Sequence, residues 1–238
     1  VLGGITVLFL LPTAVSVAHA TLAQTFFTLI VAISLFTSRW WMEQADTTRS
    51  SASTAGSPGR LALVAAAMVW IQLVLGAVMR HTGAGLAVPD FPLAYGQIVP
   101  SLSPDSLGQY NRLLIDTDIR IAADGAITSS QIAIHLMHRY WGIVTGIVLL
   151  WSAHRLFWRS PQGSRHRRLG LALGLVTVSQ VTLGALTVLT GKTVEIATAH
   201  VALGALLLAL STISVLYCYR EAGPARVPAG ITIGEAAA

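Results

Sequence analysis

The chain has 238 residues, of which 54% are hydrophobic and only 11% charged, so it is too apolar for an ordinary soluble domain. Its net charge of +5 could indicate a nucleic-acid partner, but the basic residues lie in short segments between apolar runs, as in membrane proteins. We therefore expect an integral membrane protein without a nucleic-acid partner. With a single cysteine, Cys218, the chain cannot form an intramolecular disulfide, a C-x-x-C redox pair or a cysteine metal cluster.

Six apolar segments are each expected to form a membrane helix, which makes the fold all-α and polytopic. They are residues 1–11, 17–37, 61–80, 132–152, 169–189 and 196–218. The chain begins at Val1 inside an apolar run that lacks the basic start of a signal peptide, so we expect upstream sequence to be missing. Residues 1–37 are then the remainder of an N-terminal half-bundle, and residues 61–218 form a C-terminal four-helix bundle.

Basic residues predict which connections face the cytoplasm. Most arginines lie in three segments that we expect to be cytoplasmic: 38–60, 153–168 and the tail 219–238. The first is predicted to be a linker, flexible over Ser50–Gly59 and with the domain boundary near residue 58, and the tail is expected to be disordered. The outer connections are expected to be 12–16, 81–131 and 190–195.

A motif near the start of the chain recurs near its end at one constant offset. The first copy consists of Leu2-Gly3, Thr6-Val7-Leu8, Ala18-His19 and Leu22, and the second of Leu183-Gly184, Thr187-Val188-Leu189, Ala199-His200 and Leu203. Because the spacing is preserved through a helix, a loop and the next helix, duplication explains it better than chance. Two further helices precede the second copy, so the parent is expected to have two parallel four-helix halves, the first incomplete here.

Four histidines fall in the first turns of apolar helices, where an unpaired ring is costly: His19, His135, His138 and His200. In an up-down-up-down bundle the helices 132–152 and 196–218 are diagonal and run in the same direction, so His138 and His200 can face each other. Two neutral imidazoles can bind a haem iron from both sides, whereas zinc would need further ligands. The alternative is hydrogen bonding to neighbouring helices. His81, His154 and His166 lie at a helix end or in a basic loop and need no special role.

Small residues follow three of these histidines by four positions: Ala23, Gly142 and Gly204. They could leave room for a macrocycle, or they could serve ordinary helix packing. His135 lies on nearly the same helix face as His138 but closer to water, where it could contact a haem propionate or a substrate. Arg139 could pair with a propionate or extend to lipid headgroups. His19, the repeat image of His200, is expected to belong to a second histidine pair whose other member is missing.

Three sets of residues resemble the heme A synthase family of cytochrome oxidase assembly. They are RHTGAGLAVPDFPLAYGQ at Arg80–Gln97, HLMHR at His135–Arg139, and the pair LGGITVL…SVAHATLAQ and LGALTVL…ATAHVALGAL. The resemblance runs from Val1 to about Tyr219. It implies a haem b between His138 and His200 in the C-terminal half, and a site for the substrate haem o in the N-terminal half, with His19 as an iron ligand.

The resemblance also bears on catalysis. The family's first N-terminal histidine follows a glutamate in an E-x-x-H-R pattern, and that glutamate is implicated in the reaction. Neither residue is in this chain, so the fragment alone is expected to be inactive. His135 occupies the corresponding position in the second half and is a catalytic candidate. Some bacterial members carry two cysteines where this chain has Val88 and Ala94, so no thiol role of that pair applies here.

The implied activity is oxidation of a haem o methyl group to a formyl group by successive hydroxylation and loss of water, giving haem a for cytochrome c oxidase. The implied location is the bacterial plasma membrane, with lipid around a multi-pass chain. Expected partners are an electron donor such as a ferredoxin, heme O synthase and further copies of the chain. Two alternatives are a diheme b-type cytochrome, disfavoured because these histidines all lie near one face, and a proton-coupled transporter, disfavoured because the spans lack Asp and Glu.

Overall fold

A computed structural model describes residues 2–9, 12–43, 56–117 and 125–222, and these residues form helices and connections without strands. The helices are α1 (Leu2–Leu8), α2 (Thr13–Phe36), α3 (Arg39–Glu43), α4 (Gly56–His81), the 3-10 helix η1 (Ala84–Leu86), α5 (Pro104–Asp116), α6 (Ser129–Arg159), α7 (Arg165–Leu189) and α8 (Val194–Ala222). Five of them, α2, α4, α6, α7 and α8, are long and apolar enough to cross a membrane. The prediction of an all-α, polytopic chain is confirmed.

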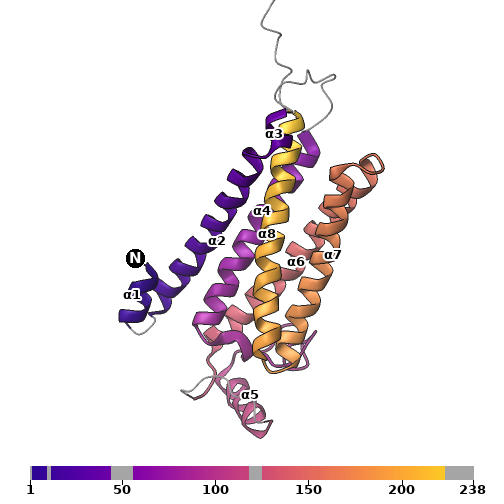
Figure 1. Ribbon diagram of the computed structural model, residues 1–238. Coiled ribbons are helices and arrows are strands. Elements are labelled where there is room, and N and C mark those ends of the chain that lie inside the picture. The colour runs from indigo at the N-terminus through magenta and orange to yellow at the C-terminus, as the bar shows by residue number, and fades with distance from the viewer. Residues whose placement is uncertain (1, 10–11, 44–55, 118–124, 223–238) are drawn as a thin grey trace, which may run out of the picture.

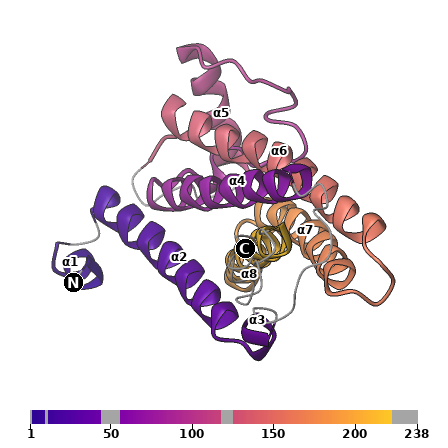
Figure 2. The same cartoon turned by 90° about the horizontal axis from the view of Figure 1, so that it is seen from above.

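Four of the long helices form a bundle in which each packs against two others. Helix α4 contacts α6, α6 contacts α7, α7 contacts α8, and α8 contacts α4 (Figures 1 and 2). Helices α6 and α8 therefore occupy opposite corners, as the up-down-up-down order predicts. Helix α2 lies outside this bundle against α4 and α8, where Trp70 Nε1 donates to Thr25 Oγ1 at 3.2 Å.

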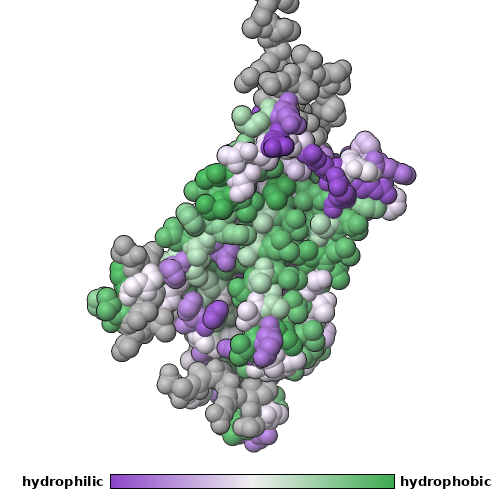
Figure 3. Space-filling view, viewed as in Figure 1, coloured by the Kyte–Doolittle hydropathy of each residue, from purple (hydrophilic) through white to green (hydrophobic). Residues whose placement is uncertain are grey.

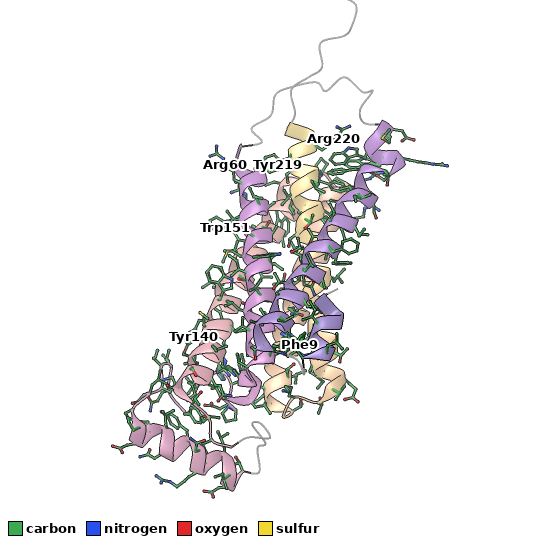
Figure 4. All side chains as sticks on the ribbon, turned by 90° about the vertical axis from the view of Figure 1, so that its left-hand side faces the viewer. Phe9, Arg60, Tyr140, Trp151, Tyr219 and Arg220 are labelled. Carbon is green, nitrogen blue, oxygen red and sulfur yellow. The ribbon has the colours of Figure 1, made fainter. Side chains whose placement is uncertain are left out.

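The outside of the bundle is apolar, as a lipid environment requires. Figure 3 shows a belt of hydrophobic side chains with hydrophilic ones gathered toward the ends. In Figure 4, Trp151 lies on the flank, Arg60 and Arg220 lie at one end, and Tyr140 lies toward the other. Trp151 is 57% exposed and Leu175 61%, a degree of exposure that suits contact with acyl chains. We call the arginine-bearing end the inner end and the opposite end the outer end.

Apolar side chains from all four bundle helices fill the inner half of the bundle. They are Ala65, Val69, Leu149, Ala153, Leu156, Leu173, Leu207 and Leu208. Helices α6 and α7 approach most closely at Gly170. A Cβ atom added there would lie 2.8 Å from both the Ala153 carbonyl oxygen and the Phe157 backbone nitrogen. Only glycine therefore fits at this crossing without moving a helix.

A small cap closes the outer end of the bundle (Figure 1). Its core consists of Ala87, Val88, Ala94, Tyr110, Leu114, Ile127, Ile132 and Leu136. The rings of Tyr95 and Tyr110 stack with centroids 3.8 Å apart. Burial, together with the nearby Asp90 and Tyr110, raises the pKa of Tyr95, so its hydroxyl stays protonated and donates to the Ala87 carbonyl oxygen at 2.7 Å.

The cap is where the sequence prediction was incomplete, because 81–131 was read as a loop. The structure forms η1 and the 13-residue helix α5 there. The signal for α5 was present: Ser103 accepts a hydrogen bond from the Ser106 backbone N–H as the N-cap, Pro104 follows it, and Asp105 lies in the first turn. With 13 residues, helix α5 is too short as well as too polar to span a membrane.

Helix ends also differ from the predicted apolar runs. Helix α6 begins at Ser129 rather than 132, because Thr128 and Gln131 form a capping box. Helix α4 begins at Gly56 rather than 61, so 56–60 belong to a helix and not to a linker, and α3 occupies another part of the expected linker. Linker residues 44–55 and tail residues 223–238 lie outside the described residues.

Candidate functional site

His138 and His200 lie at the outer end of diagonal helices. His138 falls within the first three turns of α6 and His200 within the first two turns of α8. Both side chains are half-buried. Both imidazoles therefore belong to the outer end of one four-helix bundle, on diagonal helices, and their role as a pair of iron ligands stays a prediction.

Each of these imidazoles packs against a glycine of a neighbouring helix. A Cβ atom added to Gly76 on α4 would lie 3.1 Å from Cε1 of His138, and one added to Gly184 on α7 would lie 3.1 Å from Cε1 of His200. The N-terminal copy of the repeat has the same contact, because a Cβ on Gly3 would lie 3.3 Å from Cε1 of His19. The repeated Leu-Gly and Ala-His strings are therefore two sides of one packing contact.

Two glutamines that the sequence analysis missed lie beside the histidine pair. Gln72 Nε2 donates to the His138 carbonyl oxygen at 3.0 Å and lies 3.3 and 3.2 Å from the two ring nitrogens. Gln180 takes the matching position on α7, one turn before Gly184. The signal was a shared Q-x-x-L-G-A string, Gln72–Ala77 and Gln180–Ala185, that places an amide inside each membrane span. The two helix pairs of this half thus repeat each other.

The glutamines occupy the space over the glycines that follow the histidines. A Cβ atom on Gly142 would lie 2.9 Å from Gln72 Nε2, and one on Gly204 would lie 3.2 Å from Gln180 Nε2. The room that the sequence predicts for a macrocycle is therefore filled by the ends of flexible side chains. Rotation about the glutamine χ angles would clear it without moving a helix.

The polar atoms of this region fit a haem. The buried atoms His200 Nδ1, Gln72 Oε1 and Gln180 Oε1 have no hydrogen-bond partner among the described residues. Buried polar atoms of this kind usually have a partner, and a bound group can supply it or reorient them. In the described part of the chain, no three or more His, Cys, Asp or Glu side chains cluster as a metal site. Two opposed imidazoles suit a porphyrin iron, which already has four ring nitrogens.

His135 lies one turn before His138 and Arg139 directly follows it, but both side chains point into the cap. His135 is 3% exposed, and its Nδ1 lies 2.9 Å from the Ala84 carbonyl oxygen. Because a carbonyl only accepts, Nδ1 carries the proton, and Nε2 accepts from Arg139 Nη2 at 3.0 Å. Arg139 also donates to the carbonyl oxygens of Leu93 at 2.8 Å and Asp90 at 3.0 Å.

Through these contacts, His135 and Arg139 connect α6 to the cap. Both ring nitrogens of His135 are engaged, and its catalytic role stays a prediction from the resemblance. Arg139 directs its guanidinium to backbone oxygens, and its predicted pairing with a propionate likewise stays a prediction. The loop they hold is ordered from within by the Asp90 carboxylate, which accepts from the backbone N–H groups of Tyr95 and Gly96 at 2.8 and 2.9 Å.

The remaining histidines lie apart from this pair. His19 is exposed on α2, which packs outside the bundle, and no second histidine of its predicted site is present among the described residues. His154 is exposed toward the inner end, and His166 lies beside Tyr217 with ring centroids 5.8 Å apart. His81 ends α4, and its carbonyl oxygen accepts from Thr13 Oγ1 at 3.4 Å.

The chain is similar to known proteins of cytochrome oxidase assembly. A family model described as "COX15-CtaA: Cytochrome oxidase assembly protein" matches residues 1–212. A heme A synthase of Rhodospirillum centenum is 31% identical over 148 residues, 60% of this chain and 35% of that protein. The heme A synthase of Sphingopyxis alaskensis is 29% identical over 65% of this chain and 39% of its own length, and that of Rhizorhabdus wittichii 27% over 76% and 47%. The matched part spans less than half of each relative.

Proposed function

The chain belongs to the COX15-CtaA family of cytochrome oxidase assembly proteins, and we propose that it acts as part of a heme A synthase. The proposed reaction converts a methyl group of haem o to a formyl group by successive hydroxylation and loss of water. The substrate site would include His19. An external electron donor such as a ferredoxin would be required.

One observation supports a second haem in the C-terminal half: His138 and His200 lie near the outer ends of opposite helices of a single bundle. These two histidines would hold the iron of a haem b. When bound through two imidazoles, such a group supplies one-electron transfer, because no iron position remains open for substrate. The apolar bundle around it keeps water away from the ring.

The two glutamines would hold the histidines in position. A histidine that binds iron through one ring nitrogen needs an acceptor for the N–H of the other. The unpaired Oε1 atoms of Gln72 and Gln180 are acceptors of this kind. Gly76 and Gly184 then set how closely each ring can approach its neighbouring helix.

Replacing either proposed ligand tests this assignment. We expect His138→Ala and His200→Ala each to abolish the low-spin haem b spectrum of the purified protein, because one imidazole cannot fill both axial positions. His154→Ala is the matched control, since His154 is exposed toward the other end of the same helix as His138, and it should leave the spectrum unchanged. A low-spin spectrum that survives both substitutions would remove the two histidines from the site.

A further inference from the structure

A groove runs along the seam between α7 and α8 at the inner end of the bundle, far from the histidine pair. Its volume is about 390 Å³, and it is lined by Arg165, Arg168, Leu169, Ala172, Ile213 and Tyr217. The four α7 residues are spaced at helical intervals of three and four, so they share one face of the helix. Ile213 and Tyr217 lie one turn apart on α8 and form the opposite wall.

The groove changes from cationic to apolar along its length. Arg165 and Arg168 belong to the first turn of α7, and Leu169 and Ala172 lie deeper in the membrane span. Figure 3 shows the same change, with hydrophilic side chains gathered at the inner end of α7 and hydrophobic ones below them. A ligand that fits this gradient has an anionic head and an apolar tail.

Aromatic side chains hold the cationic end in place. The Arg165 guanidinium carbon lies 4.9 Å from the centre of the Trp40 ring, and Trp40 packs against Tyr217 with centroids 4.4 Å apart. Arg220 makes the equivalent contact with Trp41 at 4.7 Å and donates to its carbonyl oxygen at 3.0 Å. A guanidinium over an aromatic face keeps its charge and its N–H donors.

The positive charge of the groove is not neutralised within the described residues. The groove lining contains no carboxylate, and Glu43 is the only acidic side chain that the structure describes in the inner connections. Neither Arg165 nor Arg168 forms an ion pair in the described part of the chain. Basic pockets between membrane helices on this side of a bilayer bind anionic lipid headgroups.

From this geometry we propose that the groove binds an anionic phospholipid. Arg165 and Arg168 hold the headgroup phosphate, Tyr217 borders it, and Leu169, Ala172 and Ile213 contact the upper part of one acyl chain. The groove is smaller than a whole phospholipid, so the rest of the lipid stays in the bilayer. The lipid would join α7 to α8, and through Trp40 to α3, at the end of the protein opposite the histidines.

The test measures lipid retention by native mass spectrometry of the chain released from nanodiscs that contain equal amounts of phosphatidylglycerol and phosphatidylcholine. We expect one phosphatidylglycerol to be retained in preference to phosphatidylcholine. Each arginine near a headgroup favours anionic lipid about fivefold, so Arg165→Gln with Arg168→Gln should reduce the preference about 25-fold. Arg159→Gln, an exposed arginine at the end of α6 outside the groove, is the matched charge control and should retain the preference.

Two further arms separate a lipid from a free phosphate. Ala172→Phe fills the apolar part of the groove without changing charge and should lower retention, whereas Leu175→Phe on the lipid-facing side of α7 should not. Inorganic phosphate added in excess should not displace the lipid. Equal retention of the two lipids, a preference that survives the double substitution, or displacement by phosphate alone would each overturn the proposal. Size-exclusion profiles of all variants distinguish loss of lipid from loss of fold.

Discussion

At the scale of single residues, the contact between an imidazole and a glycine occurs in three helix pairs: Gly3 with His19, Gly76 with His138, and Gly184 with His200. Because glycine has no Cβ atom, the imidazole ring fits between the two helices. The glycine therefore sets how far the ring projects into the bundle. An imidazole nitrogen must lie close to 2 Å from a metal to bind it. A shift of the ring by a few tenths of an ångström would therefore change the distance from its nitrogen to a bound metal.

Gly184→Ala tests this contact. The new Cβ would lie 3.1 Å from Cε1 of His200, closer than comfortable packing, so the ring must move. We expect haem affinity to fall by up to about tenfold, which corresponds to about 1.4 kcal/mol and lies within the cost of overpacking. Alanine favours helix by about 1 kcal/mol over glycine, so the melting temperature without haem should stay the same or rise.

Gly108→Ala is the control for that substitution, because nothing lies within 4 Å of a Cβ at this position of α5. It should give the gain in helix propensity without a change in haem affinity. A titration of both purified apo-proteins with haem, followed by absorbance, makes the comparison. Equal affinities for the two variants would show that the glycine does not position the ring.

At the scale of helices, the packing of α6 on α7 depends on one crossing point. Around Gly170 the neighbouring atoms belong to the α6 backbone, which cannot rotate away as a side chain can. By contrast, a Cβ on Gly146 of α6 would meet only Val181 Cγ2 at 3.7 Å, an ordinary contact. The two glycines look alike in the sequence, and their environments differ.

We therefore expect Gly170→Ala to destabilise the protein by about 1–3 kcal/mol through overpacking. This cost exceeds the stabilisation that alanine gives through its higher helix propensity. Gly146→Ala should be neutral or stabilising. Thermal unfolding of both variants in the same detergent, followed by circular dichroism, measures the difference. Melting temperatures that fall together, or not at all, would argue against a tight crossing.

The helices and the residues between them differ in how well the sequence predicts them. Apolar runs located all five long helices, because membrane insertion depends on length and hydropathy, and the order of helices gave the diagonal placement of His138 and His200. Helix α5 is not found in this way, because a short amphipathic helix has no long apolar run. A single amide in an apolar run is a weak signal, and only the string shared by the two helices marks Gln72 and Gln180. The contacts of His135 and Arg139 depend on backbone oxygens of the folded cap, which no local pattern encodes.

At the scale of the whole molecule, the distribution of arginines predicts orientation. Cysteine introduced at Gln162 should be labelled from the cytoplasmic side, and cysteine at Lys192 or Ser101 from the outside, in a Cys218→Ser background. Ser101 serves as the reporter in the outer cap because its neighbour Pro100 is buried and Ser101 is exposed. Labelling of position 101 from the cytoplasm would invert the proposed topology.

The division into halves predicts what this chain can do alone. The bundle formed by α4, α6, α7 and α8 contains both members of the His138 and His200 pair, so we expect the chain as it stands to bind one haem b. The site of His19 has a single described histidine on one complete helix, and misplacement by about 1 Å can cost roughly 100-fold in rate. Membranes supplied with haem o and a reductant should therefore yield no haem a.

Extraction and chromatography of haems from those membranes measure the outcome against empty membranes. Haem a above that background would mean that the C-terminal half is itself catalytic, with His135 as the first residue to replace. Absence of bound haem b would instead mean that this bundle alone does not fold around the group. The two results point to different halves of the protein.

The hairpin repeat has a mechanical consequence. Helices α4 and α6 carry one of the two proposed ligands, and α7 and α8 carry the other, so neither helix pair would complete the coordination by itself. An iron held by both would act as a cross-link between them, and ligand binding to the folded form alone shifts stability by mass action. A bundle that has not received its iron would be held only by side-chain packing and would open more readily to membrane proteases. The lifetime of the protein in the cell would then report the supply of haem.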